Sequence, residues 1–336
     1  MKKLTKTIVS LLLLTFAVTL AACGKDDSKQ TQEDSSEENT SLITVGYAQC
    51  GSESAWRIAN TESIQQYCSE ENGIKLIFEN AEGDIDKQIA SVRSFIEQKV
   101  DIIGLAPVVA DGWDDVLKEA KAAGIPVILV DRTVNTEDDS LYTCWIGSDF
   151  LLEGYKAADW IIEYMNSLGR GTDKLNVALL QGTLGAGAEL GRTQGVEEML
   201  NAKNNYQFVY KDTGDFTTDG GIDNMQKILD KKLKVDILIS ENDDMTMGAI
   251  QVMEENGLKP GKDITILTFD GVKAAFEAMV DGKINCTVEC NPLSGKSFVE
   301  TVQKVMNGDS VEKKVYVQED IFPSDTAADY IDHRKY

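Results

Sequence analysis

Charged, amide and aromatic side chains recur just after short apolar segments of this chain, and they are its best candidates for chemistry. In chain order they are Glu53, Trp56, Arg57, Asp131, Arg132, Thr183, Arg192, Asp215, Phe216, Asn242 and Asp270. Carboxylates accept hydrogen bonds while guanidinium and amide groups donate them, so together they satisfy a hydroxyl, which does both. An aromatic side chain such as Trp56 or Phe216 suits the C–H face of a sugar ring. The residue types therefore favour a sugar site.

Some of these residues also have structural interpretations that the sequence leaves open. Asp and Asn after a strand are common helix caps, so Asp215, Asn242 and Asp270 could each be a cap. Asp243 and Asp244 are better explained as caps than as metal ligands, because consecutive residues do not form a metal cage.

The basic residues have similar alternatives. Arg132 could form a surface ion pair with its neighbour Asp131, and Arg192 could be a solvated helix residue. The functional interpretation gains weight because all the candidates follow expected strands. The carboxyl ends of parallel strands lie at one edge of a sheet, where ligands bind.

Composition and charge exclude several classes of function. The chain has 33 Lys and Arg against 56 Asp and Glu, and its net charge of −23 has the wrong sign for a nucleic-acid-binding surface. His333 is the sole histidine, which argues against His-based catalytic triads and His-rich metal sites. A GxxxxGK(S/T) phosphate loop is also absent from the sequence. We therefore expect a binding protein, not an enzyme, with no metal or other cofactor.

Apolar segments alternate with amphipathic stretches from Leu42 onward, a pattern typical of βαβ units. The apolar segments span 42–49, 75–81, 101–108, 125–131, 175–182, 206–212, 235–242 and 263–270. They show no polar alternation, which suits strands buried on both faces of a parallel sheet. With 336 residues, the chain is long enough for two such domains.

We expect an α/β protein with two doubly wound, parallel-sheet lobes joined by a three-crossing hinge. The first lobe should comprise residues 42–148 plus about 289–319, and the second residues 149–288 plus about 320–336. The tail is predicted to form a strand at 284–290, a helix at 293–308 and a strand at 313–320. Because ligands of open parallel sheets bind at the strands' carboxyl ends, the site should lie in the cleft between the lobes.

The N-terminus carries an export signal. Residues 1–22 combine early lysines with an apolar run that ends in small residues, and the tetrapeptide Leu-Ala-Ala-Cys ends at Cys23. This tetrapeptide resembles the bacterial lipobox, in which the cysteine is diacylated, and two acyl chains give stable anchoring. A plain signal peptide with a chance cysteine is the alternative. Residues 24–41 contain no apolar side chain, so 23–41 should form a lipidated, disordered acidic tether.

The remaining cysteines are odd in number: Cys50, Cys68, Cys144, Cys286 and Cys290. Cys286 and Cys290 share one expected strand, where four residues span about 13 Å, whereas a disulfide needs α-carbons about 4.4–6.8 Å apart. We expect buried, unpaired cysteines. Without a CxxC pair or further histidines, they are not expected to bind a metal.

Several short motifs carry a family resemblance that covers residues 42–336. They are GSESAWR (51–57), APVV (106–109), DR (131–132), QGT (181–183), GDF (214–216), NDDM (242–245) and GAIQ (248–251). Together with the two-lobed alternation, they resemble the type I periplasmic sugar-binding proteins of ABC transporters, of which ribose-binding proteins are broad relatives. The motifs are most similar to galactofuranose-binding members of this family.

The resemblance implies a set of ligand contacts and a role. The contacts would be Glu53, Ser54, Trp56, Arg57, Asp131, Arg132, Arg192, Phe216, Asn242 and Asp270, with Asn291 as a further candidate. The implied protein is a monomeric, lipid-anchored extracytoplasmic receptor that closes on a monosaccharide and delivers it to an ABC permease and its ATPase. Cys290 departs from the pattern, because relatives often hold a polar group near this position.

Three other functions are alternatives for the same sequence. A sensory receptor of the same fold, coupled to a chemosensory or kinase partner, remains open. A transcriptional regulator is disfavoured because no helix-turn-helix precedes residue 42. A secreted glycosidase is disfavoured because no pair of carboxylates stands out as acid and base.

Overall fold

The computed structural model describes residues 42–336. The segments predicted to be a signal peptide (1–22) and an acidic tether (23–41), and the predicted lipidation site Cys23, lie outside these residues. Within the described part of the chain, no helix has both the length and the apolar character needed to cross a membrane.

The first sheet is entirely parallel and has six strands in the order β11-β5-β4-β3-β1-β2. Its strands are β1 (Ile43–Gln49), β2 (Ile74–Asn80), β3 (Ile102–Leu105), β4 (Val127–Val130), β5 (Cys144–Gly147) and β11 (Lys314–Tyr316). Residues of β3, β4 and β5 are buried throughout, as expected for strands covered on both faces.

The second sheet also has six strands, in the order β12-β10-β9-β8-β6-β7. They are β6 (Leu175–Gln181), β7 (Tyr206–Thr213), β8 (Ile237–Ser240), β9 (Thr265–Asp270), β10 (Cys286–Glu289) and β12 (Ile321–Pro323). Only the edge strand β12 runs antiparallel to its neighbour. The two sheets therefore share one connectivity pattern, which confirms the predicted doubly wound α/β class.

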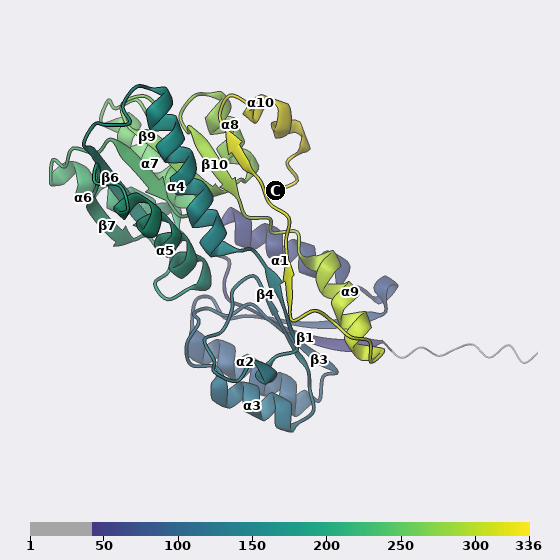
Figure 1. Cartoon of the computed structure of the whole chain (residues 1–336). Helices are drawn as coiled ribbons and strands as arrows, with labels where there is room; N and C mark the ends of the chain where they lie inside the picture. The colour runs from purple at the N-terminus through teal and green to yellow at the C-terminus, as the bar shows by residue number, and fades with distance from the viewer. Residues whose placement is uncertain (1–41) are drawn as a thin grey trace, which may run out of the picture. The chain divides into compact units, whose positions relative to one another are not determined.

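Helices cover both faces of the first sheet (Figure 1). They are α1 (Ala55–Tyr67), α2 (Ile85–Gln98), α3 (Asp114–Ala122) and α9 (Gly295–Met306), with the short 3-10 turns Glu70–Asn72 and Asp139–Leu141. Ile64 of α1 and Phe298 of α9 pack on one face, while Phe95 of α2 and Leu117 of α3 pack on the other. Each face thus has its own apolar core.

The second sheet is covered in the same way. Its helices are α4 (Phe150–Ser167), α5 (Gly187–Asn201), α6 (Thr218–Asp230), α7 (Asp243–Glu255), α8 (Lys273–Val280) and α10 (Ala327–Tyr330), with a final 3-10 turn at Ile331–His333. Ile161 of α4 and Val196 of α5 lie on one face, and Met225 of α6 and Met253 of α7 on the other. We call the parts of the chain built on the two sheets the first and second lobes.

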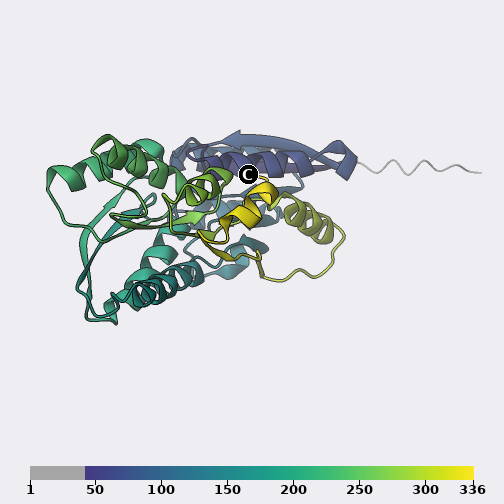
Figure 2. The ribbon, with the colours of Figure 1, turned by 90° about the horizontal axis from the view of Figure 1, so that it is seen from above.

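The chain passes three times between the lobes. The first connection joins β5 to α4, the second leads from β10 through residues 290–294 to α9, and the third joins β11 to β12. The last of these, in yellow, can be followed between the lobes in Figure 1 and from above in Figure 2. This is the expected three-crossing hinge.

Some details of the prediction are wrong. The segment 313–320 forms strand only at Lys314–Tyr316, because the chain then leaves the first sheet and pairs again as β12. Neither β5 nor β12 was predicted, since both are short and lack a long apolar run. The five cysteines between residues 42 and 336 are buried and unpaired, as expected.

Candidate ligand-binding site between the lobes

One pocket gathers side chains from both lobes. It is lined by Glu53, Ser54, Trp56, Arg57, Asp131, Arg132, Ala188, Arg192, Phe216, Asn242, Asp270 and Cys290. The space between these residues, counted together with the solvent at its opening, is about 280 Å³, so the pocket suits only a small ligand. The lining follows the carboxyl ends of strands in both sheets, where a ligand of parallel sheets is expected.

The wall from the first lobe is a network of two guanidinium and two carboxylate groups. Arg57 donates from Nη2 to Asp131 Oδ2 at 2.5 Å and from Nε to Glu53 Oε1 at 3.3 Å. Arg132 reaches the same Glu53 oxygen from Nη2 at 3.1 Å and donates from Nη1 to the Val108 carbonyl at 2.9 Å. The network fixes the orientation of all four side chains relative to one another.

Two polar atoms of this wall have no protein partner. Glu53 Oε2 and Arg132 Nε are both buried without a hydrogen bond within residues 42–336. A buried polar group without a partner costs free energy, which a ligand restores by bonding to it. One of these atoms accepts and the other donates, so a hydroxyl could satisfy either.

The wall from the second lobe is organised around Arg192, which α5 presents with only 2% of its surface exposed. Its Nε donates to Glu153 Oε2 at 2.7 Å and its Nη2 to Asp270 Oδ1 at 3.2 Å. Its Nη1 donates to the backbone carbonyl of Glu241. The interpretation of Arg192 as a solvated helix residue is therefore wrong, and burial likewise excludes a surface pair of Asp131 and Arg132.

Two aromatic side chains complete the pocket. Trp56, from the first turn of α1, donates from Nε1 to the Cys290 carbonyl at 2.6 Å and packs within the apolar core of the second lobe. Phe216 follows β7, and the Arg132 guanidinium lies 5.4 Å from its ring centroid. Each aromatic residue thus contacts the opposite lobe or its connection.

The backbone is left-handed at three lining residues. Asp131, Phe216 and Asp270 have φ of 62°, 60° and 98°. Side chains rarely adopt this region, and such conformations concentrate at functional sites, where the surrounding structure holds them in place. Here they turn the chain sharply at the ends of β4, β7 and β9.

The two walls differ in charge state. Burial would raise the pKa of Glu53, but the nearby Arg57 and Arg132 hold it below its usual value. Burial raises the pKa of Asp270 well above its usual value, against the attraction of Arg192. Glu53 is therefore an ionised acceptor, whereas burial makes the carboxyl group of Asp270 easier to protonate than an exposed aspartate.

Ser54 and Asn242 each cap a helix and also line the pocket. Ser54 is the N-cap of α1, where its hydroxyl accepts from the Arg57 amide at 3.1 Å. Asn242 is the N-cap of α7 and donates from Nδ2 to the Phe216 carbonyl at 2.8 Å. The expectation that Asp243 and Asp244 are caps is wrong, because both lie in the first turn of α7.

The structure brings together all but one of the residues predicted to contact a ligand. Asn291 does not line the pocket; its amide donates to Glu319 Oε1 at 2.7 Å in the second connection. Ala188 and Cys290 line the pocket but were not predicted. Thr183 and Asp215 border an adjoining cavity instead. The departure of Cys290 from the family pattern was the one signal pointing to it.

Direct contacts also join the lobes beside the pocket. The Ala55 amide at the start of α1 donates to Asp244 Oδ2 at 3.0 Å. The Ala110 amide, which follows β3, donates to the Gly185 carbonyl, before α5, at 2.9 Å. The lobes are therefore held against each other in this structure.

Comparison with known proteins agrees with this architecture. Residues 45–310 match the family model described as the periplasmic binding protein domain. The galactofuranose-binding protein YtfQ of Escherichia coli is 38% identical over 297 residues, covering 87% of this chain and 92% of that protein.

Solved structures give the same result. A structure from Mycobacterium smegmatis in complex with β-D-fucofuranose has a TM-score of 0.84 and 42% identity, covering 88% of this chain and 96% of that one. The binding-protein component of the arabinose ABC transporter from Shewanella sp. ANA-3, bound to α- and β-L-arabinofuranose, has a TM-score of 0.82 and 39% identity, covering 87% and 95%. The comparisons confirm a binding protein rather than an enzyme. The chain belongs to the periplasmic binding protein family.

Proposed function

We propose that this protein captures a single monosaccharide in its furanose form between the two lobes and delivers it to an ABC permease. The observation that carries the proposal is the pocket itself, to which both lobes contribute charged side chains and an aromatic or apolar wall. Such a site bonds the hydroxyls of one sugar from two sides.

The choice of a furanose is supported by the relatives. Galactofuranose, fucofuranose and arabinofuranose are the sugars named for the three proteins compared above. The small volume of the pocket argues against an oligosaccharide. The ionised Glu53 and the guanidinium groups of Arg132 and Arg192 would contact the hydroxyls, and Trp56 or Phe216 would cover an apolar face of the ring.

Lobe closure would couple binding to delivery. A ligand shifts an equilibrium only by its difference in affinity for the two states, so the sugar must bond to both lobes to favour the closed one. The three connections would act as the hinge that absorbs the backbone change. A permease could then recognise the closed receptor.

The proposal is tested by calorimetry with a panel of furanoses and pyranoses, together with solution scattering. We expect at least one furanose to bind with micromolar or better affinity, about −8 kcal/mol. The same sugar should reduce the radius of gyration and change tryptophan fluorescence. Scattering curves that are identical with and without saturating sugar would exclude closure.

The fluorescence signal needs its own control because Trp113, Trp145 and Trp160 also emit. The variant Trp56→Phe keeps an apolar ring and loses the indole, including its bond to the Cys290 carbonyl. It should remain folded and lose most of the sugar-induced fluorescence change. If the fluorescence change is undiminished in this variant, it arises from a tryptophan other than Trp56.

Asp244→Ala tests whether contacts between the lobes contribute to affinity without touching the sugar. Asp244 does not line the pocket, but its carboxylate accepts from the amide at the start of α1. Such a contact at a helix N-terminus is worth roughly 0.3–2 kcal/mol, so sugar affinity should fall about 2- to 30-fold by calorimetry. Asp219→Ala, at an exposed first-turn position of α6, is the control and should leave affinity unchanged. Equal affinities in both variants would contradict the role of Asp244.

The position of the receptor in the cell is a further part of the proposal. We expect the protein to be extracytoplasmic and held at the membrane by acylation of Cys23. The tetrapeptide that ends at Cys23 follows an apolar run, and two acyl chains are sufficient for stable anchoring.

Cys23→Ser tests the anchor directly. The variant should move from the membrane fraction to the soluble fraction after cell fractionation, because the acyl chains can no longer be attached. Cys68→Ser, which removes a buried cysteine of the first lobe, is the control and should stay with the membrane. A Cys23→Ser protein that remains bound as tightly as before would rule out the lipid anchor.

A further inference from the structure

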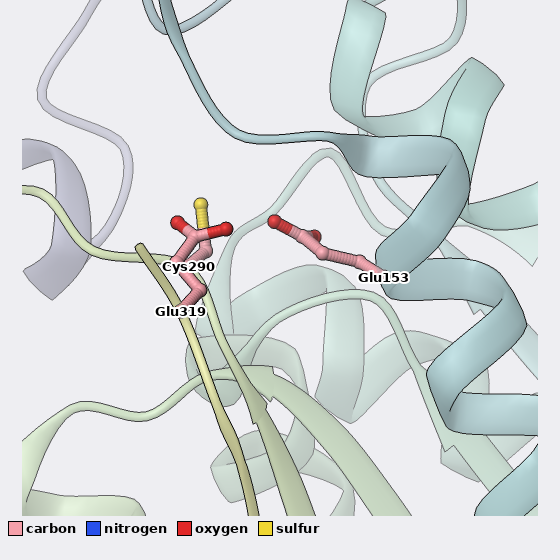
Figure 3. Close-up of side chains that lie close together, drawn as sticks. All are labelled: Glu153, Cys290 and Glu319. Atoms are coloured by element: carbon pink, nitrogen blue, oxygen red, sulfur yellow. The ribbon is translucent and has the colours of Figure 1, made fainter. Parts of the chain in front are cut away.

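Two buried side chains, Glu153 and Cys290, and the half-buried Glu319 meet where the lobes are joined, beside the ligand pocket (Figure 3). Glu153 lies in the first turn of α4, Cys290 directly follows β10, and Glu319 lies between β11 and β12. One ligand-type atom from each lies within 4.8 Å of the others. Each residue therefore comes from, or adjoins, a different one of the three connections between the lobes.

The cluster has more negative than positive charge. Arg192 forms ion pairs with both Glu153 and Asp270, so its single positive charge is shared between two carboxylates. The Lys156 ammonium donates to the backbone carbonyl of Glu319, at 3.0 Å. Two carboxylates held this close together repel each other, so an additional positive charge between them would be favourable.

One atom of the cluster is buried without a hydrogen bond. Glu153 Oε1 has no partner within residues 42–336, and Glu153 is only 1% exposed. Figure 3 shows its carboxylate pointing toward Cys290 and Glu319. A buried acceptor of this kind is expected to have a partner, which a water molecule or a bound cation can supply.

The remaining neighbours would support a ligand rather than occupy its place. The Ser148 hydroxyl lies 2.5 Å from Glu319 Oε1 and 3.3 Å from Cys290 Sγ, so it orients both groups. A pocket of about 650 Å³ that is lined by Asp149, Glu153 and Glu319, among others, gives access from solvent.

We propose that Glu153, Cys290 and Glu319 bind one divalent cation of the zinc class. Zinc takes cysteine sulfur at about 2.3 Å and carboxylate oxygen at about 2.0–2.2 Å, so its ligand atoms lie about 3.5 Å from one another. The three atoms already lie within 4.8 Å of one another, so each pair would have to approach by no more than about 1.3 Å. The sulfur ligand favours zinc over calcium or magnesium, which prefer oxygen.

Such a cation would act on the hinge. It would link all three connections through one centre, and Cys290 also lines the ligand pocket. The sequence predicted no metal site because the three ligands are far apart along the chain. The inference does not depend on which sugar binds.

Calorimetric titration of the purified protein with zinc tests the site, with the cysteines kept reduced. We expect one equivalent to bind, and Glu319→Gln and Cys290→Ser to weaken it by at least about tenfold. Glu312→Gln, at an exposed position ahead of β11, and Cys286→Ser, in β10, are the matched controls and should bind as the unmodified protein does. Zinc binding that is equal in all five proteins, or absent from the unmodified one, would overturn the proposal.

Cobalt provides a second readout that does not depend on stability. A thiolate bound to Co²⁺ gives a charge-transfer absorption in the near ultraviolet, expected in the unmodified protein and in Cys286→Ser but not in Cys290→Ser. If the Cys290→Ser protein does not fold, the zinc titration of Glu319→Gln and the cobalt absorption of the unmodified protein still test whether the cluster binds a cation. Cobalt binding without this absorption would exclude Cys290 as a ligand.

Discussion

Asp131→Ala is expected to weaken sugar binding by about 2–5 kcal/mol, the range for truncating one partner of a buried, hydrogen-bonded charge pair. Asp131 is 6% exposed and lines the pocket, where its Oδ2 lies 2.5 Å from Arg57 Nη2. Its removal would take away a proposed acceptor for a sugar hydroxyl and would also release Arg57 from its fixed position. Calorimetry with the sugar identified in the panel gives the loss of affinity.

The left-handed backbone at Asp131 calls for two further variants. Asp131→Asn keeps a residue type that tolerates φ of 62°, so it separates the loss of charge from backbone strain. Asp215→Asn makes the same change at φ of 54°, at an exposed position outside the pocket. We expect reduced affinity in Asp131→Asn and none of this loss in Asp215→Asn. If the Asp131→Ala protein folds and its sugar affinity is unchanged, Asp131 does not contact the sugar.

Arg192→Met is expected to destabilise the protein by about 3–5 kcal/mol, because it leaves buried carboxyl groups without their cation. The guanidinium bonds to Glu153 at 2.7 Å and to Asp270 at 3.2 Å, and all three side chains are at least nine-tenths buried. Urea denaturation followed by circular dichroism measures the change in the free energy of unfolding.

Arg170→Met is the matched control for this effect. Arg170 also bonds to two carboxylates, Asp173 and the buried Asp236, but 35% of its side chain is exposed and Lys234 remains as a second cation beside Asp236. Exposed ion pairs contribute only about 0–1 kcal/mol, so this variant should be nearly as stable as the unmodified protein. A loss in Arg192→Met no larger than in Arg170→Met would show that the buried network contributes little to stability.

Local patterns in the sequence predicted most of the sheet architecture. The apolar segments that became β1, β3, β4, β6, β8 and β9 are mostly buried, because strands covered on both faces require apolar side chains on both. Those that became β2 and β7 lie at the sheet edges and are partly exposed, so the expectation of burial on both faces is wrong for these two strands. β5 and β12 were missed because each spans only a few residues and forms by pairing with a strand already in place.

The sequence by itself also determined where the pocket lies, since parallel strands place their carboxyl ends, and the polar residues after them, along one edge of each sheet. Only the tertiary structure decided which of those side chains face the pocket. A step of one residue past a strand reverses the direction of the side chain, and for this reason Cys290 lines the pocket whereas Asn291 does not. Contacts between the lobes could not be predicted from the sequence either. Ala55 and Asp244 are 189 residues apart, and only the packing of the two lobes brings them together.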